Sequence, residues 1–128
     1  MNFPSKGKIY SEPYGTVSII APWNYPVQLT LLPLVGAIAS GNTVLIKPSE
    51  LSLYTSEVLK TIIEDTFDRG FVDVVLGDAI VAAKVLEERF DMIFFTGSTQ
   101  VGEIVMASAA KNLTPVILEL GGKNLLVL

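Results

Sequence analysis

Residues 94–102 read Phe-Phe-Thr-Gly-Ser-Thr-Gln-Val-Gly, an apolar strand that passes through a glycine turn into a helix. A strand, turn and helix in this order are the context that a dinucleotide-binding site requires. Gly97 and Gly102 stand at the first and third glycines of G-x-G-x-x-G, but Thr99 replaces the middle one. Ser98 and Thr99 still offer hydroxyls and amides at a helix N-terminus, where an anion is favoured. An ordinary Ser or Thr N-cap explains these residues equally well.

Short β-branched runs alternate with longer helix-periodic segments on both sides of this stretch. We predict strands at 16–21, 43–47, 72–76, 92–95 and 115–120, and a sixth segment at 124–128. The strands are apolar on successive residues, which is typical of strands that helices cover on both faces. The sequence therefore predicts an α/β fold, a three-layer, doubly wound, mainly parallel five-stranded sheet of Rossmann-like type.

The helix-periodic segments also predict which side chains face the core. One helix face is marked by apolar residues at helical spacing, namely Val58, Leu59, Ile62, Ile63 and Phe67. In the segment 79–89, the residues expected to point inward are Ile80, Val81, Val85 and Leu86. Residues 27–40 are apolar nearly all round, which predicts a central and heavily covered helix. Residues 101–108 repeat the same spacing.

Charge excludes some partners. Nine basic against thirteen acidic residues give a net charge of -4, which argues against a nucleic-acid partner. No charge occurs between Gly15 and Ile46, but prolines and amides interrupt the run, so a buried strand, helix and strand explain it better than a membrane span. The N-terminus lacks the pattern of a secretory signal, so we expect a cytoplasmic protein.

The 128 residues contain no cysteine and no histidine. Within this chain, that excludes nucleophilic catalysis by a Cys-His or Ser-His-Asp arrangement, and it excludes the common zinc sites. We expect no metal site. Residues 1–128 fit one domain, and the chain ends within an apolar run, which indicates a fragment.

Lys47-Pro48-Ser49-Glu50 follows the second predicted strand, at the carboxyl edge where open α/β sheets bind ligands. Lys47 and Glu50 could both hydrogen-bond ribose hydroxyls there. A carboxylate would also repel a 2′-phosphate, which favours NAD over NADP. A capping box that begins the next helix is the alternative.

Asn24 lies in Pro22-Trp23-Asn24-Tyr25-Pro26, at the same predicted edge. Its amide could donate to a developing oxyanion. The alternative is a rigid turn, since two prolines fix φ on either side.

Glu119 lies between two leucines at the end of an apolar strand. Burial would raise its pKa and make it a usable base. The alternatives are an acid turned to solvent, or a ribose ligand, because it follows Gly97 by 22 residues where ~20 are expected. Spacing leaves this open.

Four motifs in register resemble the aldehyde dehydrogenase superfamily, and the fatty-aldehyde (class 3-like) branch is the most similar. They are Ala-Pro-Trp-Asn-Tyr-Pro (21–26), Ile-Lys-Pro-Ser-Glu (46–50), Phe-Thr-Gly-Ser-Thr-Gln-Val-Gly (95–102) and Leu-Glu-Leu-Gly-Gly-Lys (118–123). Each motif alone is weak, but together they are specific and cover the chain from Ile9 onward.

The resemblance implies an NAD(P)-binding site and assigns its residues. The implied cofactor contacts are Trp23, Lys47, Glu50, Thr96, Gly97, Ser98, Thr99, Val101, Gly102 and Leu120. Lys47 and Glu50 would hold the ribose, and Ser98 would meet the pyrophosphate. Asn24 would stabilise the oxyanion. Glu119 would activate the water that hydrolyses a thioester, which makes it a general base rather than a ribose ligand.

The same resemblance implies oxidation of an aldehyde to a carboxylic acid through a cysteine thioester. The family's cysteine lies a few tens of residues beyond Glu-Leu-Gly-Gly, in a separate catalytic domain, so we expect the chain alone to be inactive. A free-standing nucleotide-binding or interaction module derived from this fold is the alternative. A reading frame that continues past Leu128 into a cysteine-bearing segment would separate the two. We also expect weak cofactor affinity, and homo-oligomerisation or self-association through exposed apolar surface.

Overall fold

A computed structural model of the chain describes residues 7–121. The elements follow one another as β1 (Thr16–Ile20), α1 (Pro26–Ala39), β2 (Thr43–Lys47), a short 3₁₀ helix η1 (Glu50–Ser52), α2 (Leu53–Thr66), β3 (Val72–Val74), α3 (Ala79–Glu87), β4 (Met92–Ser98), α4 (Thr99–Ala110) and β5 (Val116–Gly121). The predicted segment 124–128, together with Gly122 and Lys123 of the last motif, lies outside the described residues.

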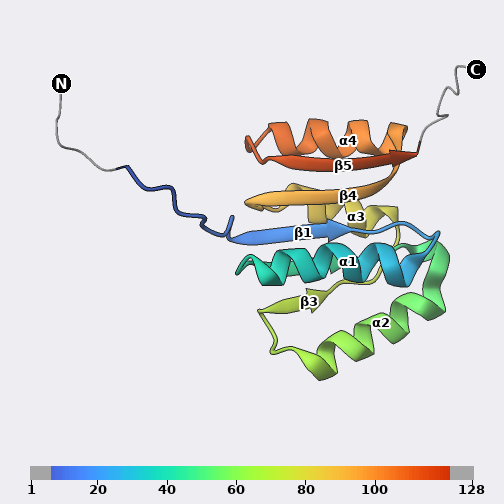
Figure 1. The fold of residues 1–128 in the computed structure, drawn as a ribbon. Coiled ribbons are helices and arrows are strands. Elements are labelled where there is room, and N and C mark those ends of the chain that lie inside the picture. The colour runs from blue at the N-terminus through green and yellow to red at the C-terminus, as the bar shows by residue number, and fades with distance from the viewer. Residues whose placement is uncertain (1–6, 122–128) are drawn as a thin grey trace, which may run out of the picture.

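The five strands form one parallel sheet in the order β3-β2-β1-β4-β5 (Figure 1). From β1 the chain moves outward to β2 and β3, then returns to the other side of β1 to add β4 and β5. The order of the strands therefore reverses between β1 and β4. This is the topological switch point at which doubly wound sheets bind ligands, beyond the carboxyl ends of the strands.

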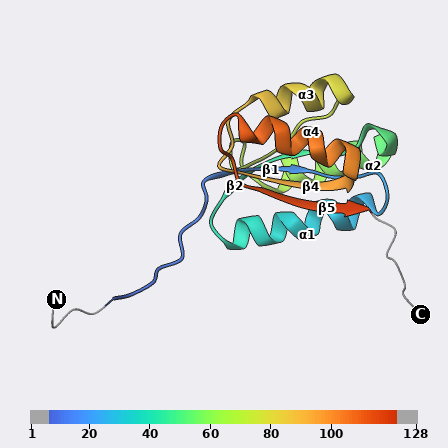
Figure 2. The same cartoon turned by 90° about the horizontal axis from the view of Figure 1, so that it is seen from above.

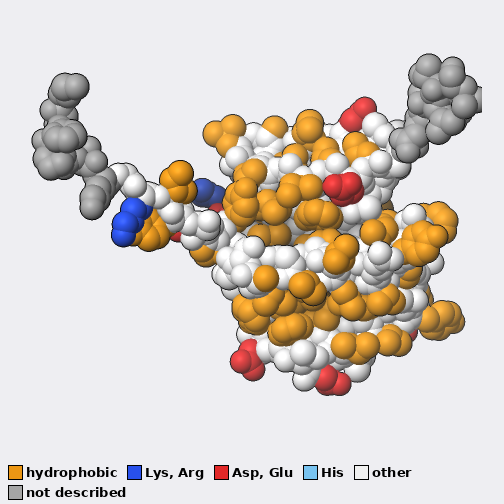
Figure 3. Space-filling model, viewed as in Figure 1, with side chains coloured by type: hydrophobic (Ala, Val, Ile, Leu, Met, Phe, Trp, Pro, Cys, Tyr) orange, Lys and Arg blue, Asp and Glu red, His pale blue; other side chains and the backbone are white. Residues whose placement is uncertain are grey.

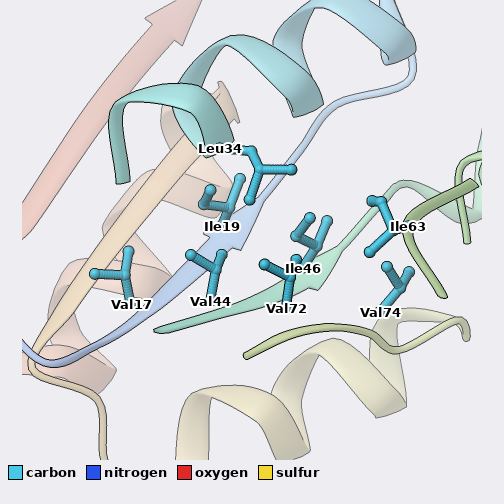
Figure 4. Close-up of a cluster of buried hydrophobic side chains, with 8 residues drawn as sticks. All are labelled: Val17, Ile19, Leu34, Val44, Ile46, Ile63, Val72 and Val74. Atoms are coloured by element: carbon cyan, nitrogen blue, oxygen red, sulfur yellow. The ribbon is translucent and has the colours of Figure 1, made fainter. Parts of the chain in front are cut away.

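Helices cover both faces of the sheet, as Figure 2 shows for α1 on one side and α3 with α4 on the other. On the α1 side, Leu34 of α1 and Ile63 of α2 pack with strand residues such as Ile19 and Ile46 (Figure 4). On the opposite side, α3 and α4 supply Val85, Leu86, Val105 and Ala109 to a second cluster that includes Ile93 and Phe95. The predicted three-layer, Rossmann-like α/β fold is confirmed.

Two strand predictions missed the end of the strand by more than one residue, while β1 and β5 differ from their predicted ends by one. β3 stops at Val74 rather than at residue 76, whereas β4 continues past Phe95 to Ser98. The extension follows from pairing, because β5 runs beside β4 until Gly121 pairs with Ser98. A local sequence signal would end the strand at Gly97, but the ladder with β5 carries it further.

The predicted helix faces were partly wrong. Of the residues predicted on these faces, Leu59, Ile63, Val85 and Leu86 are buried, whereas Val58, Ile62 and Ile80 are exposed. The predicted heavy cover of α1 is also wrong, since only Thr30 and Leu34 of this helix are buried. Periodicity predicts a helix, but it does not select the buried face when apolar residues surround the whole helix.

Within residues 7–121, no helix combines the length and apolar character needed to cross a membrane.

Candidate functional site

A cleft of about 1200 Å³ lies at the carboxyl edge of the sheet, over the switch point. It extends around this edge and is bordered by helices from both sides of the sheet, including Leu29 and Pro33 of α1 and Ala82 and Ile104 of α3 and α4. All the sequence-predicted site residues line it except Gly102. Residues distant in sequence are thus brought to one edge of the sheet by the parallel topology.

Lys47 ends β2 on the side of the sheet that faces α3 and α4, since the preceding Ile46 belongs to the α1-side cluster. Its side chain is only 2% exposed, and its Nζ donates to the carbonyl oxygen of Pro48 at 2.7 Å and to Oε2 of Glu50 at 3.3 Å. An ammonium carries three donors, so these two acceptors leave capacity for a ligand hydroxyl. The Glu50 side chain is 43% exposed and presents its carboxylate to the cleft.

The capping alternative for this segment holds in part, because Ser49 caps the short helix η1, whereas Ser52 at the start of α2 makes no side-chain cap. Ser49 is the N-cap of η1, and its Oγ accepts a hydrogen bond from the Leu51 amide at 3.2 Å. Ser49 therefore begins the helical segment, while Lys47 and Glu50 on either side of it face the cleft. The segment thus combines a helix cap at Ser49 with two charged side chains that line the cleft.

Ser98 is the N-cap of α4, and its Oγ accepts from the Val101 amide at 3.3 Å. The hydroxyl proton of a capping serine is still available to donate, so capping and anion binding are compatible. The first turn of α4 contains no acidic residue. No carboxylate in this turn therefore offsets the positive end of the α4 helix dipole, which favours a negative group in the adjoining cleft.

Gly97 lies against a buried aromatic ring, and Gly102 lies against the end of an exposed leucine side chain. A Cβ on Gly97 would lie 2.5 Å from Cζ of Phe95, whose ring is buried. A Cβ on Gly102 would lie 2.6 Å from Cδ2 of Leu120, because α4 approaches the end of β5 closely. Gly102 does not line the cleft, and its observed contact is with Leu120.

The loop after β1 places Trp23 and Asn24 in the cleft, and both side chains are exposed. Tyr25 has a left-handed backbone with φ of 49°, and Pro26 follows as the first residue of α1. A left-handed conformation at a bulky residue is unfavourable and persists only where the surroundings enforce it. The rigid-turn prediction is thus consistent with this loop, and the turn presents Asn24 to the cleft.

Glu119 lies on β5 directly beside Thr96 of β4, and both line the cleft. Phe94 packs in the α1-side cluster, so strand alternation places Thr96, two residues later, and its neighbour Glu119 on that same side. The side chain of Glu119 is exposed, which agrees with the alternative of an acid turned to solvent and not with burial. β5 is an edge strand, and no helix among the described residues covers its α1 side at this point.

Sequence reasoning missed part of the wall of the cleft. α3 contributes small residues that share one helix face, at Ala79, Ala82 and Ala83. Their i, i+3, i+4 spacing was the available signal for a surface that leaves room for a ligand. Leu51 and Ile104 complete the apolar wall on this side.

Known proteins match this chain over nearly its whole length. A sequence model described as the aldehyde dehydrogenase family matches residues 4–128. The chain is 58% identical over 116 residues to aldehyde dehydrogenase family 3 member B1 of Rattus norvegicus. It is 52% identical over 122 residues to 4,4'-diaponeurosporen-aldehyde dehydrogenase of Staphylococcus aureus. These alignments cover 91% and 95% of this chain, but only 25% and 27% of the two relatives.

Solved structures show the same likeness. Staphylococcus aureus AldH in a substrate-bound state matches with a TM-score of 0.87 and 52% identity, over 88% of this chain and 25% of that chain. An aldehyde dehydrogenase of Mycobacterium tuberculosis complexed with NAD+ matches with a TM-score of 0.80 and 35% identity, over 88% and 24%. The chain thus spans about a quarter of the proteins that it matches.

Proposed function

The chain belongs to the aldehyde dehydrogenase family, and from this premise we propose that residues 1–128 form the NAD-binding part of an enzyme that oxidises an aldehyde to a carboxylic acid. The observation that supports the proposal most directly is the shared cleft. Residues from the ends of β1, β2, β4 and β5 meet there, and they include both proposed catalytic side chains, Asn24 and Glu119.

The residues present fit a dinucleotide. On the α3 and α4 side, Lys47 and Glu50 offer donors and acceptors for a ribose, and Ser98 with the first amides of α4 offers an anion site. Val101 and the small α3 residues provide apolar walls for a flat base. We propose that Trp23, Thr96, Gly97, Thr99 and Leu120 complete the contacts, and that Gly102 contributes by letting α4 approach β5. Bound NAD would accept a hydride from the substrate.

Asn24 and Glu119 would act in the reaction at the aldehyde carbon, at the carboxyl edge of the sheet on the side of α1. The Asn24 amide would donate to the oxygen of the aldehyde as negative charge develops on it during nucleophilic attack. Glu119 would accept a proton from the water that releases the acid. The attacking thiolate must come from outside these 128 residues, which contain no cysteine, so the chain by itself should not turn over.

We propose NAD rather than NADP as the cofactor. Glu50 places a carboxylate at the proposed ribose site, where it would accept from both ribose hydroxyls but repel a 2′-phosphate. Lys47 offsets part of this repulsion, because it lies 3.3 Å from the Glu50 carboxylate. We therefore expect a preference rather than an absolute exclusion.

Titration of the 128-residue chain with NAD and NADP tests the cofactor site. Trp23 is the only tryptophan and lines the cleft, so its fluorescence reports binding directly. We expect weak NAD binding that is lost in Lys47→Met, and weaker NADP binding that improves relative to NAD in Glu50→Gln. Equal affinity for both cofactors in the unmodified chain would contradict the assignment of Glu50.

The alternative, a nucleotide-binding or interaction module without chemistry, also predicts NAD binding. The two differ in their need for Asn24 and Glu119, which a binding module does not require. In a polypeptide that joins this chain to a cysteine-bearing catalytic domain, Asn24→Ala and Glu119→Gln should each lower aldehyde-dependent NADH formation by about 100-fold or more. NAD binding without aldehyde-dependent NADH formation in the unmodified joined polypeptide would favour the module, and unchanged turnover in both variants would contradict the roles of Asn24 and Glu119.

A further inference from the structure

The first turn of α4 contacts the end of β5 at two points. Oγ1 of Thr99 donates a hydrogen bond to the carbonyl oxygen of Gly121 at 3.3 Å. One turn further along α4, Gly102 lies so close to Leu120 that an added Cβ would be 2.6 Å from Cδ2 of that leucine. Both contacts fall within two residues of Glu119, on the strand that carries it.

Both contacts are made to an edge strand. It pairs with β4 alone, and residues 119–121 are all exposed. Among residues 7–121, Thr99 makes the only side-chain hydrogen bond that reaches β5. The β4 residues that pair with this part of the strand are 96–98, the turn that leads into α4.

We propose that Thr99 is a positioning residue that fixes Glu119 relative to the N-terminal turn of α4. The proton of its hydroxyl is directed to Gly121, so the side chain acts on the strand, while its backbone amide stays at the proposed anion site. This inference rests on the proposed function, because it assigns the phosphates and the base to the two elements that Thr99 connects.

A mechanical consequence follows from this arrangement. An anion bound at the N-terminus of α4 restricts the motion of the turn 97–99. Because the Thr99 hydroxyl is hydrogen-bonded to Gly121, the end of β5 is then restricted as well. The position of the Glu119 carboxylate then depends on whether the cofactor site is filled. Without the hydroxyl, the cofactor site and the strand end should fluctuate separately.

The first test needs no cofactor. Amide hydrogen exchange at residues 119–121 is measured in the 128-residue chain, in Thr99→Val, in Thr99→Ser and in the matched control Thr114→Val. The hydroxyl of Thr114 also donates to a carbonyl oxygen, that of Phe90 at 3.0 Å. This hydrogen bond lies just before β5, at the amino ends of the strands, whereas Thr99 acts at their carboxyl ends. We expect about fivefold faster exchange in Thr99→Val, the typical effect of one lost hydrogen bond, and unchanged exchange at 119–121 in the other two variants.

The second test adds NAD and follows the carboxyl carbon resonance of Glu119, assigned with Glu119→Gln. With NAD at a saturating concentration for each variant, binding should shift this resonance in the unmodified chain and in Thr99→Ser, but not in Thr99→Val. Because every variant is measured at saturation, the absence of the shift reports the lost connection to β5 and not a change in NAD affinity.

The outcomes distinguish the two proposals. Wild-type exchange in Thr99→Val, or a Glu119 shift that persists in this variant, would overturn the positioning role. If the unmodified chain binds no NAD, the proposed function fails, and the exchange experiment still decides whether Thr99 fixes the end of β5.

Discussion

Gly97 matches the first glycine of a dinucleotide-binding motif, but packing inside the protein already explains why glycine stands at this position. In a dinucleotide fingerprint the first glycine permits a tight turn. Here Gly97 belongs to β4, and the buried ring of Phe95 occupies the space that a side chain would need. The glycine is therefore required for packing even before any ligand binds.

This contact predicts that Gly97→Ala destabilises the chain. The added methyl would meet Cζ of Phe95 at 2.5 Å, and a buried ring cannot move aside freely. Overpacking of this kind typically costs about 1–3 kcal/mol, so the free energy of unfolding from urea titration should fall by that amount. Gly36→Ala is the matched control, because nothing lies within 4 Å of its added Cβ in the middle of α1. It should raise stability by up to about 1 kcal/mol.

At the scale of elements, the N-terminus of α4 combines a cap with a proposed phosphate site. Ser98 caps this helix through one hydrogen bond to Val101. In α3 the same position is held by Asp78, whose Oδ1 accepts from Ile80 at 2.9 Å and from Val81 at 3.2 Å. Aspartate is thus an effective cap in this protein, as it is in helices generally.

The comparison predicts that Ser98→Asp separates the two roles. Aspartate would cap α4 and interact favourably with its dipole, so stability should change by less than about 0.5 kcal/mol. The added carboxylate would repel a pyrophosphate, so NAD binding measured by Trp23 fluorescence should be lost. The reverse exchange in α3, Asp78→Ser, should leave both stability and NAD binding nearly unchanged. Retained NAD affinity in Ser98→Asp would place the phosphates elsewhere.

The same elements show what the sequence could predict. The β-branched runs located all five strands of the described sheet, because strands covered on both faces must be apolar. The site residues could be grouped because parallel strands bring their carboxyl ends to one edge. Val58 and Ile80 were placed wrongly in the interior, and the exposure of Glu119 stayed open, since burial depends on which elements pack against each face. The end of β4 depended likewise on its pairing with β5.

At the scale of the whole molecule, apolar side chains are distributed unevenly over the surface. Figure 3 views the α1 side and shows hydrophobic side chains spread across this face with few charged groups between them. Val35 of α1 and Ile117 of β5 are among the exposed ones. Ile117 lines a second hollow together with Pro33, Gly36 and Phe94, and Val35 lies on α1, the helix that borders this hollow.

We predict that the 128-residue chain self-associates through this α1–β5 face. Contiguous apolar patches above ~600 Å² are uncommon on soluble monomers, so covering the face with a second copy should be favourable. The weight-average mass from light scattering should rise with concentration. Combined Val35→Lys and Ile117→Lys should shift the rise to higher concentration, because two exposed charges would have to be desolvated in the contact. Val58→Lys introduces the same charge at an exposed residue of α2 and should leave the concentration dependence unchanged. A constant monomer mass would refute the self-association, whereas an equal effect of Val58→Lys would place the contact on another face.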